Sequence, residues 1–206
     1  MTLDYIAFGQ SMPAWEAGDH DSVRATLAVS VRRLARAGAD FFVCPDNTAH
    51  MALERPGEEL ALPGLHIAEV VADQAARDGR TRVGVLGTRY LMGGPVYPRA
   101  FTARGISAEV LEAGDCDIIN KIIFAELVNG MSTEASRQEY VRIIGKLAAR
   151  GCDAVALACT EIPLLVTPES SPLPTLDSTC LLARAAFDVA AGHEALPAWR
   201  GGPTGG

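Results

Sequence analysis

Two segments of this chain repeat one pattern, and each ends in a residue that can exchange a proton. Gly38 and Asp46 of the first segment match Gly151 and Cys159 of the second, both at an offset of 113 residues. Removing a proton from a carbon atom and returning one to the opposite face requires an acid/base group on each side of that carbon. The repeat therefore predicts an enzyme that moves protons at a carbon atom next to a carboxylate.

The repeat continues downstream, because Leu62-Pro63 is echoed by Leu173-Pro174 at an offset of 111 residues. Each half reads as helix, strand, polar turn and helix. Two copies of such a unit can place their polar turns face to face across a cleft. Ligands of open parallel sheets bind beyond the carboxyl ends of the strands, and Asp46, Thr88 and Cys159 are all expected at such ends.

The repeat and the hydrophobic periodicity together predict an α/β fold of two pseudosymmetric lobes, with mainly parallel sheets and the active site in the inter-lobe cleft. The expected strands are 3–8, 40–44, 64–67, 82–86, 107–111, 153–158 and 175–176. The expected helices are 21–37, 48–55, 68–78, 95–104, 115–129, 133–150, 160–165 and 178–191. One lobe is expected to hold residues 1–86 and 176–206, and the other residues 87–175. Gly and Pro are frequent in residues 197–206, which are expected to form a frayed tail.

The composition is that of an ordinary globular chain and argues against several functions. With 206 residues, of which 49% are apolar, the chain can form one large domain or two small lobes. A net charge of −7, with Lys and Arg nowhere in a run, argues against nucleic-acid and anionic-membrane binding. No apolar run approaches the roughly 20 residues that span a bilayer, and no signal peptide is visible. The five cysteines form neither a C-x-x-C pair nor a zinc pattern, so we expect no metal site and a reducing cytoplasmic location.

Cys159 suits proton transfer because a thiol with a reference pKa of about 8.5 is partly ionised at neutral pH. A helix N-terminus lowers a thiol pKa further, and a helix is expected to begin at Thr160. Asn47, Thr48 and Thr160 add side-chain donors at the two helix starts. These donors could hold the substrate carboxylate and the charge that develops on it.

Three segments, residues 46–50, 83–88 and 159–164, resemble motifs of the aspartate/glutamate/hydantoin racemase superfamily in their order and separation. The pattern is most similar to the aspartate racemase branch, from residue 5 to residue 191. The resemblance implies a cofactor-independent racemase built as a homodimer of two-lobed subunits, with decarboxylases and maleate isomerases among its relatives. It also implies Cys159 as one acid/base, with Asn47, Thr48, Thr88 and Thr160 around the carboxylate of a small substrate.

The first motif departs from that family, whose members usually carry a cysteine where this chain has Asp46. Cys44, two residues earlier, could replace that cysteine only if the turn were rearranged. A carboxylate with a reference pKa of about 3.9 needs desolvation before it can work as a base. We therefore expect an unequal pair, with Cys159 as the better base and Asp46 as the better acid or as a fixed charge.

Other departures concern the second carboxylate of a dicarboxylic substrate and the N-terminus. Archaeal-type aspartate racemases carry an Arg after the second strand and a Lys in the middle lobe. This chain has no Arg before Arg24 and has Thr133 at the middle-lobe position. The family also begins with a strand and a Gly-rich turn upstream of Leu3. We expect that wall of the pocket to be missing, supplied differently, or lost to a late choice of start site.

Each candidate residue also has a purely structural interpretation. Asp46 could cap the turn before the helix near Thr48, and Cys159 could be a small packing residue. His50 is expected to be a structural histidine that supports the site, and Glu161 either orients a neighbour or favours the helix N-terminus. Two other functions stay open: a decarboxylase or one-handed isomerase that uses only Cys159, and a catalytically silent protein that binds carboxylates.

Overall fold

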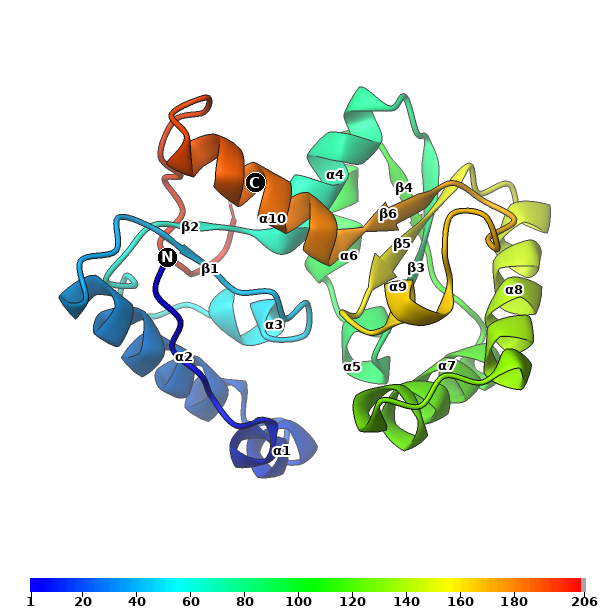
Figure 1. Cartoon of the computed structure of the whole chain (residues 1–206), viewed down its shortest axis with the longest axis horizontal. Coiled ribbons are helices and arrows are strands. Elements are labelled where there is room, and N and C mark those ends of the chain that lie inside the picture. Colours follow the sequence, from blue (N-terminus) through cyan, green and yellow to red (C-terminus); the bar gives the residue numbers. More distant parts are fainter. Residues whose placement is uncertain (205–206) are drawn as a thin grey trace.

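The computed structural model describes residues 1–204 and shows two lobes side by side (Figure 1). The smaller lobe is built on a two-stranded parallel sheet of β1 (Phe42–Val43) and β2 (Gly64–Leu65). Its helices are α1 (Phe8–Glu16), α2 (His20–Arg36) and α3 (His50–Leu53). The expected α/β fold of two lobes with parallel sheets is confirmed.

The larger lobe is built on a parallel sheet in the order β4-β3-β5-β6. Its strands are β3 (Arg82–Gly87), β4 (Ser107–Glu109), β5 (Ala154–Ala158) and β6 (Thr175–Asp177). The helices after β2 are α4 (Ile67–Arg77), α5 (Arg89–Met92), α6 (Val96–Thr102), α7 (Ala113–Ala125), the 3-10 turn η1 (Leu127–Asn129), α8 (Glu134–Ala149), α9 (Ile162–Leu165) and α10 (Ser178–Ala190).

Two apolar clusters cover the two faces of the four-stranded sheet. Val83 and Val85 of β3 pack with residues of α4 and α6, whereas Val155 and Leu157 of β5 pack with residues of α7 and α8. Successive residues of β5 thus point to opposite, fully covered faces, which is why the strand is apolar at every position. The sheet is therefore a rigid support for the turns at its carboxyl edge.

The repeat in the sequence is also a repeat of local structure. Helices α2 and α8 both end before a glycine of positive φ, at 85° for Gly38 and 87° for Gly151. Only glycine adopts this left-handed conformation without steric cost, and it lets the chain reverse toward a strand. The backbone hydrogen bonds of the two helix ends recur at the same offset. In the sheets that follow, β1 and β2 correspond to β5 and β6.

The two halves differ in the strands that neighbour β1 and its counterpart β5. β5 lies between β3 and β6, whereas β1 pairs only with β2 within residues 1–204. Asp153, just before β5, accepts hydrogen bonds from the amides of Thr81 and Arg82 at the start of β3. Asp40, at the matching place before β1, is exposed. Within the described residues, the smaller lobe thus has no counterpart of β3.

The expected strand over residues 3–8 is wrong. Residues 1–7 have no regular structure, and the helix α1 begins at Phe8. A short apolar segment becomes a strand only when a sheet edge pairs with it. Leu3 and Tyr5 instead remain exposed, so their apolar character does not report a buried strand.

The expected frayed tail is also wrong for the described part of residues 197–206. The amide of Gly64 donates to the carbonyl of Trp199, and the amide of Gly202 donates to that of Leu53, each at 2.8 Å. The Trp199 ring lies 4.8 Å from the His66 ring, measured between centroids. Trp199 therefore anchors the C-terminal segment against β2, which its Gly- and Pro-rich composition does not indicate. Residues 205–206 lie outside the described part of the chain.

The expected lobe boundaries at residues 86 and 176 fall inside β3 and β6. Both strands belong to the four-stranded sheet, so the sheet of the larger lobe begins before residue 87 and ends after residue 175. Helix α10 then runs back toward the smaller lobe (Figure 1). No helix within residues 1–204 is both long and apolar enough to cross a bilayer.

Candidate active site

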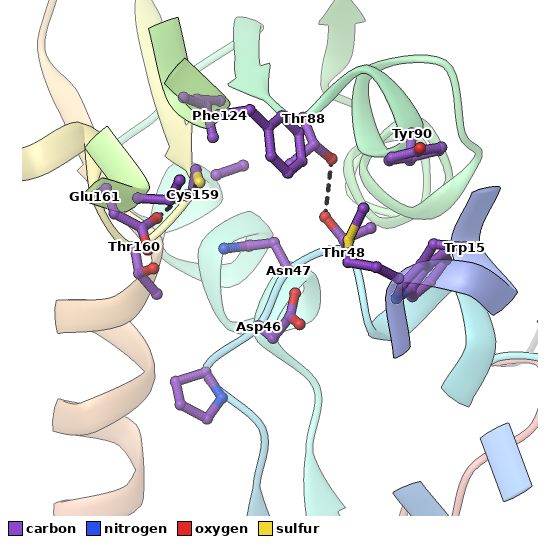
Figure 2. A pocket seen from close by; sticks show the side chains of 15 residues that line it. Trp15, Asp46, Asn47, Thr48, Thr88, Tyr90, Phe124, Cys159, Thr160 and Glu161 are labelled. Carbon is purple, nitrogen blue, oxygen red and sulfur yellow. Dashed lines mark hydrogen bonds between the residues drawn. The ribbon is translucent and has the colours of Figure 1, made fainter. Parts of the chain in front are cut away.

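A cavity of about 170 Å³ brings together the polar turns of both halves. Its lining comes from α1, the β1–α3 turn, the β3–α5 turn, α7 with η1, and the β5–α9 turn (Figure 2). The lining residues are Met12, Trp15, Pro45, Asp46, Asn47, Thr48, Thr88, Tyr90, Ile123, Phe124, Val128, Ala158, Cys159, Thr160 and Glu161. All the predicted site residues except His50 lie in this lining.

Asp46 follows β1, and one of its carboxylate oxygens stabilises the β1–α3 turn. The amide of Ala49 donates to Asp46 Oδ1 at 3.1 Å, which is the capping role expected as the structural interpretation. The side chain nevertheless lines the cavity. Asp46 is exposed to solvent, yet protein atoms surround its carboxyl group closely enough to disfavour the charged form. Asp46 therefore caps the turn and also presents its carboxyl group to the cavity.

His50 supports the Asp46 turn from behind the cavity. The amide of Ile67 donates to His50 Nε2 at 3.3 Å, so Nε2 is unprotonated and Nδ1 carries the hydrogen. That hydrogen is donated to the carbonyl of Asp46 at 2.9 Å. Burial, reinforced by His66, holds the pKa of His50 well below its usual range. His50 is thus a neutral structural histidine that stabilises the turn, as expected.

The electrostatics of Asp46 favour its use as a base. Burial by surrounding protein atoms raises the pKa of the Asp46 carboxyl, and the nearby charge of Glu161 raises it further. The amides of Ala49 and Thr48 lower it, but less than burial raises it. A carboxylate with a raised pKa binds a proton more readily, which is the desolvation that a carboxylate base requires.

Cys159 directly follows β5 in the larger lobe. It donates its thiol hydrogen to Glu161 Oε2, with Sγ and Oε2 3.0 Å apart. Burial is the main reason that the pKa of Cys159 lies far above its ordinary value of 9.0, and the hydrogen bond and charge of Glu161 raise it further. The expected lowering by a helix N-terminus is wrong. Helix α9 begins only at Ile162 and has four residues, so its dipole is weak and does not offset burial beside a carboxylate.

The hydrogen bond between Cys159 and Glu161 decides which member of the pair holds a proton. The ordinary pKa is 3.8 for Asp46 and 9.0 for Cys159, and both values rise in the fold. A thiol that donates to Glu161 is protonated, so a single proton shared by the pair rests on Cys159. In this state the carboxylate of Asp46 can accept a proton and the thiol of Cys159 can donate one.

Asn47 is tied into the core below the cavity. Its Oδ1 accepts a hydrogen bond of 2.7 Å from the hydroxyl of Tyr97, and its Nδ2 donates to Ser178 Oγ at 2.9 Å. Ser178 in turn donates to the carbonyl of Leu157 on β5 at 2.9 Å. An amide nitrogen carries two hydrogens, so the second hydrogen of Nδ2 is available to a ligand. This chain of bonds fixes the β1–α3 turn against β5 of the larger lobe.

Two threonines link the turns across the cavity. The hydroxyls of Thr48 and Thr88 are 2.9 Å apart (Figure 2), and the amide of Leu91 donates to Thr88 Oγ1 at the start of α5. Thr160 lines the cavity beside Cys159. Together with Asn47, these hydroxyls give the cavity several neutral hydrogen-bond donors, which suit a carboxylate.

Cys44, the alternative to Asp46, does not line the cavity. It packs into the core of the smaller lobe with Phe42 and Leu53, and burial raises its pKa to about 12. The carboxylate of Asp46 is therefore the ionisable group that the first turn presents to the cavity.

Part of the lining was not predicted from the sequence. Met12 and Trp15 come from α1, Tyr90 from α5, Phe124 from α7 and Val128 from η1. These residues carry no polar motif, and their apolar type is the same as that of the core. Only their position in the fold separates them from packing residues.

Comparison with known proteins agrees with this geometry. The sequence profile of the family described as Asp/Glu/Hydantoin racemase matches residues 4–186. The chain is similar to the broad specificity amino-acid racemase RacX of Bacillus subtilis (strain 168), with 24% identity over 173 residues, or 81% of this chain and 71% of RacX.

Solved structures show the same likeness. A crystal structure of a candidate Asp/Glu racemase from Yersinia pestis has 33% identity and a TM-score of 0.80, covering 92% of this chain and 83% of that one. An aspartate racemase homologue from Pyrococcus horikoshii has 26% identity and a TM-score of 0.74, covering 93% of this chain and 82% of that one.

Proposed function

Because the chain belongs to the Asp/Glu/Hydantoin racemase family, we propose that it is an amino-acid racemase in which Asp46 and Cys159 exchange protons with opposite faces of the substrate α-carbon. One observation carries the proposal: the matching turns of the two halves bring a carboxyl group and a thiol to a single cavity. The similarity to a broad specificity amino-acid racemase supports the reaction class. The finer roles of the residues rest on the geometry described above.

In the proposed reaction, the Asp46 carboxylate removes the α-hydrogen and the Cys159 thiol delivers a proton to the other face. Negative charge develops on the substrate carboxylate as the α-proton leaves. In this proposal Asn47, Thr160 and the hydroxyl that accepts in the Thr48–Thr88 hydrogen bond donate to that charge, which lowers the barrier. The product state has a protonated Asp46 and a Cys159 thiolate, and the opposite enantiomer returns the pair to its starting state.

We propose that this reaction needs no cofactor, because two proton-transfer groups suffice. A pyridoxal-dependent racemase would need a lysine amine in the cavity to hold the cofactor as a Schiff base. The two lysines of the chain, Lys121 and Lys146, both lie outside the lining, and Lys146 pairs with Asp115 at 2.7 Å. The side chains at the cavity therefore fit direct proton transfer.

The test is α-hydrogen exchange in D2O. Single amino acids are incubated with the protein, the Cα–H signal is followed by NMR, and both enantiomers are quantified by chiral chromatography. Exchange with inversion is expected from the native protein. Asp46→Asn and Cys159→Ser should each lower the inversion rate at least 100-fold, the lower end of the usual contribution of a general acid or base (roughly 10²–10⁴-fold).

Matched controls exist in the same chain. Asp40→Asn changes an exposed aspartate of the first repeat, and Cys180→Ser changes an exposed cysteine on α10. Both controls should keep the native rate. Full inversion by Asp46→Asn would contradict the proposed two-base mechanism.

A second candidate function is favoured by the hydrogen bond that keeps Cys159 protonated. A decarboxylase or one-handed isomerase needs only a thiol that protonates a carbanion from one face. The same experiment, extended to malonates and hydantoins, separates the two. Release of CO2, or deuterium in one enantiomer only, would support this candidate, whereas ligand-induced stabilisation without exchange would support a silent carboxylate-binding protein.

We further propose a cytoplasmic homodimer. All five cysteines are free, which suits a reducing compartment. Sedimentation equilibrium of the purified chain tests the assembly, because a species of 21.7 kDa would contradict the dimer.

A further inference from the structure

The cavity offers no positive side chain to a ligand. Its lining contains no lysine, arginine or histidine within residues 1–204, and its two ionisable carboxyl groups belong to Asp46 and Glu161. Arg89 follows Thr88 in sequence but lies outside the lining, and its guanidinium pairs with Asp117 at 3.5 Å. A second substrate carboxylate would therefore lose its hydration without gaining a cation.

Removing water from a second carboxylate without pairing it with a cation disfavours dicarboxylic substrates strongly. A carboxylate moved from water into a partly buried site needs a paired charge or several donors. The neutral donors of the cavity, Asn47 with the threonines, number enough for one carboxylate, that of the α-carbon. A second carboxylate would also be repelled by Asp46 and Glu161.

The rest of the cavity lining is largely apolar and partly aromatic. It includes Met12 and Trp15 of α1, Tyr90 of α5, Phe124 of α7 and Val128 of η1, and we call these five residues the apolar wall. Figure 2 shows Trp15 and Tyr90 across the cavity from Cys159 and Glu161. The rings of Trp15 and Tyr90 have centroids 6.1 Å apart, so the two rings pack against each other and form one surface. Such a surface gains free energy by burying apolar ligand atoms.

We propose that the substrate is an amino acid with an apolar or aromatic side chain, which packs against the apolar wall, and that aspartate and glutamate are poor substrates. This inference rests on the proposed function, because it takes an α-amino acid to be bound between Asp46 and Cys159. The cavity volume of about 170 Å³ lies below the roughly 300–1,000 Å³ of pockets for drug-sized ligands. It therefore suits a molecule of the size of a single amino acid.

The test compares leucine, methionine and phenylalanine with aspartate and glutamate in the D2O exchange assay. At least one apolar amino acid should have a kcat/KM tenfold or more above those of aspartate and glutamate. Equal or faster turnover of aspartate or glutamate would overturn the inference and leave the proposed function intact.

A pair of variants at the cavity rim sharpens the test. Val128 lies in η1 and is 43% exposed, so a longer side chain is tolerated there. Val128→Arg adds the missing cation and should reduce the apolar-to-dicarboxylic ratio of kcat/KM at least tenfold, whereas the uncharged Val128→Met should keep the apolar preference. An unchanged ratio in Val128→Arg would count against the charge argument.

Binding to Cys159→Ala keeps the inference testable without turnover. Calorimetric titration of this variant with leucine, phenylalanine, aspartate and glutamate should give tighter binding of the apolar amino acids. If no amino acid exchanges its α-hydrogen with the native protein, the proposed function fails, while this order of affinities still decides the ligand class. Tighter binding of aspartate or glutamate would overturn the inference.

Discussion

The thiol of Cys159 donates a hydrogen bond to Glu161 Oε2, with the two atoms 3.0 Å apart. A carboxylate that accepts from a thiol stabilises its protonated form, and burial of Cys159 acts in the same direction. Glu161 is therefore a positioning residue that keeps the acid of the proposed pair ready to donate.

Replacing Glu161 by Gln should lower the pKa of Cys159. The amide carries no charge, so the thiolate loses one source of repulsion, while burial still keeps its pKa above the ordinary value. The thiolate absorbance in the ultraviolet, followed during alkaline titration, should rise at lower pH than in the native protein. Glu169→Gln, at an exposed position of the following loop, is the matched control. A titration in Glu161→Gln that is unchanged or shifted to higher pH would refute the role of Glu161.

The pH dependence of activity should show an acid limb that belongs to Asp46. The base must be ionised, so kcat/KM is full above the pKa of Asp46 and falls as the pH drops through it. Burial places that pKa above the ordinary 3.8. The pKa of Cys159 is raised above 9.0, so the thiol remains protonated and activity should persist at least to that pH.

Asp46→Cys replaces the carboxyl group of the first turn by a thiol and should move this acid limb to higher pH. A thiol base ionises only near its ordinary pKa of 9.0, or higher when buried, so less of the enzyme is active at neutral pH. The profile of kcat/KM against pH for native protein and variant checks this. An acid limb at the same pH in both proteins would show that Asp46 is not the group that titrates.

Tyr97→Phe should destabilise the fold, because it removes the hydroxyl that donates to Asn47 Oδ1 at 2.7 Å. Both side chains are buried, and an unsatisfied buried acceptor costs about 1–3 kcal/mol. Urea unfolding monitored by circular dichroism measures the free energy of unfolding. Tyr5→Phe, at a residue that is 77% exposed, should have no measurable effect, and a native stability for Tyr97→Phe would contradict the prediction.

Trp199→Ala should lower the free energy of unfolding by about 1–2 kcal/mol, since the ring is partly buried and full burial of a large apolar side chain is worth about 1.5–3 kcal/mol. The Trp199 ring stacks on His50 with an interplanar angle of 14° and also contacts His66. Since His50 holds the Asp46 turn, the inversion rate should fall as well. Leu196→Ala, at a residue that is 60% exposed, is the control. Native stability in Trp199→Ala would show that the C-terminal segment is not an anchor.

The sequence by itself determined the features that depend on local hydrogen bonds and on strand order. Gly38 and Gly151 end their helices because only glycine takes the positive φ that the turn requires, and this need is visible in the residue type. Asp46 and Cys159 follow apolar strands, and parallel strands present their carboxyl ends at one edge. These two facts were enough to predict that both side chains reach one cavity.

The tertiary structure alone decided the protonation of the pair, the apolar wall and the C-terminal anchor. The pKa of Cys159 depends on its burial and on the placement of the Glu161 carboxylate, whereas the sequence showed only a thiol before an expected helix. In the sequence, Trp15 and Trp199 are indistinguishable from ordinary apolar residues. The fold places Trp15 in the cavity lining and Trp199 beside His50. Desolvation and Coulomb energy at a point depend on every group nearby in space, and distance along the chain does not report which groups those are.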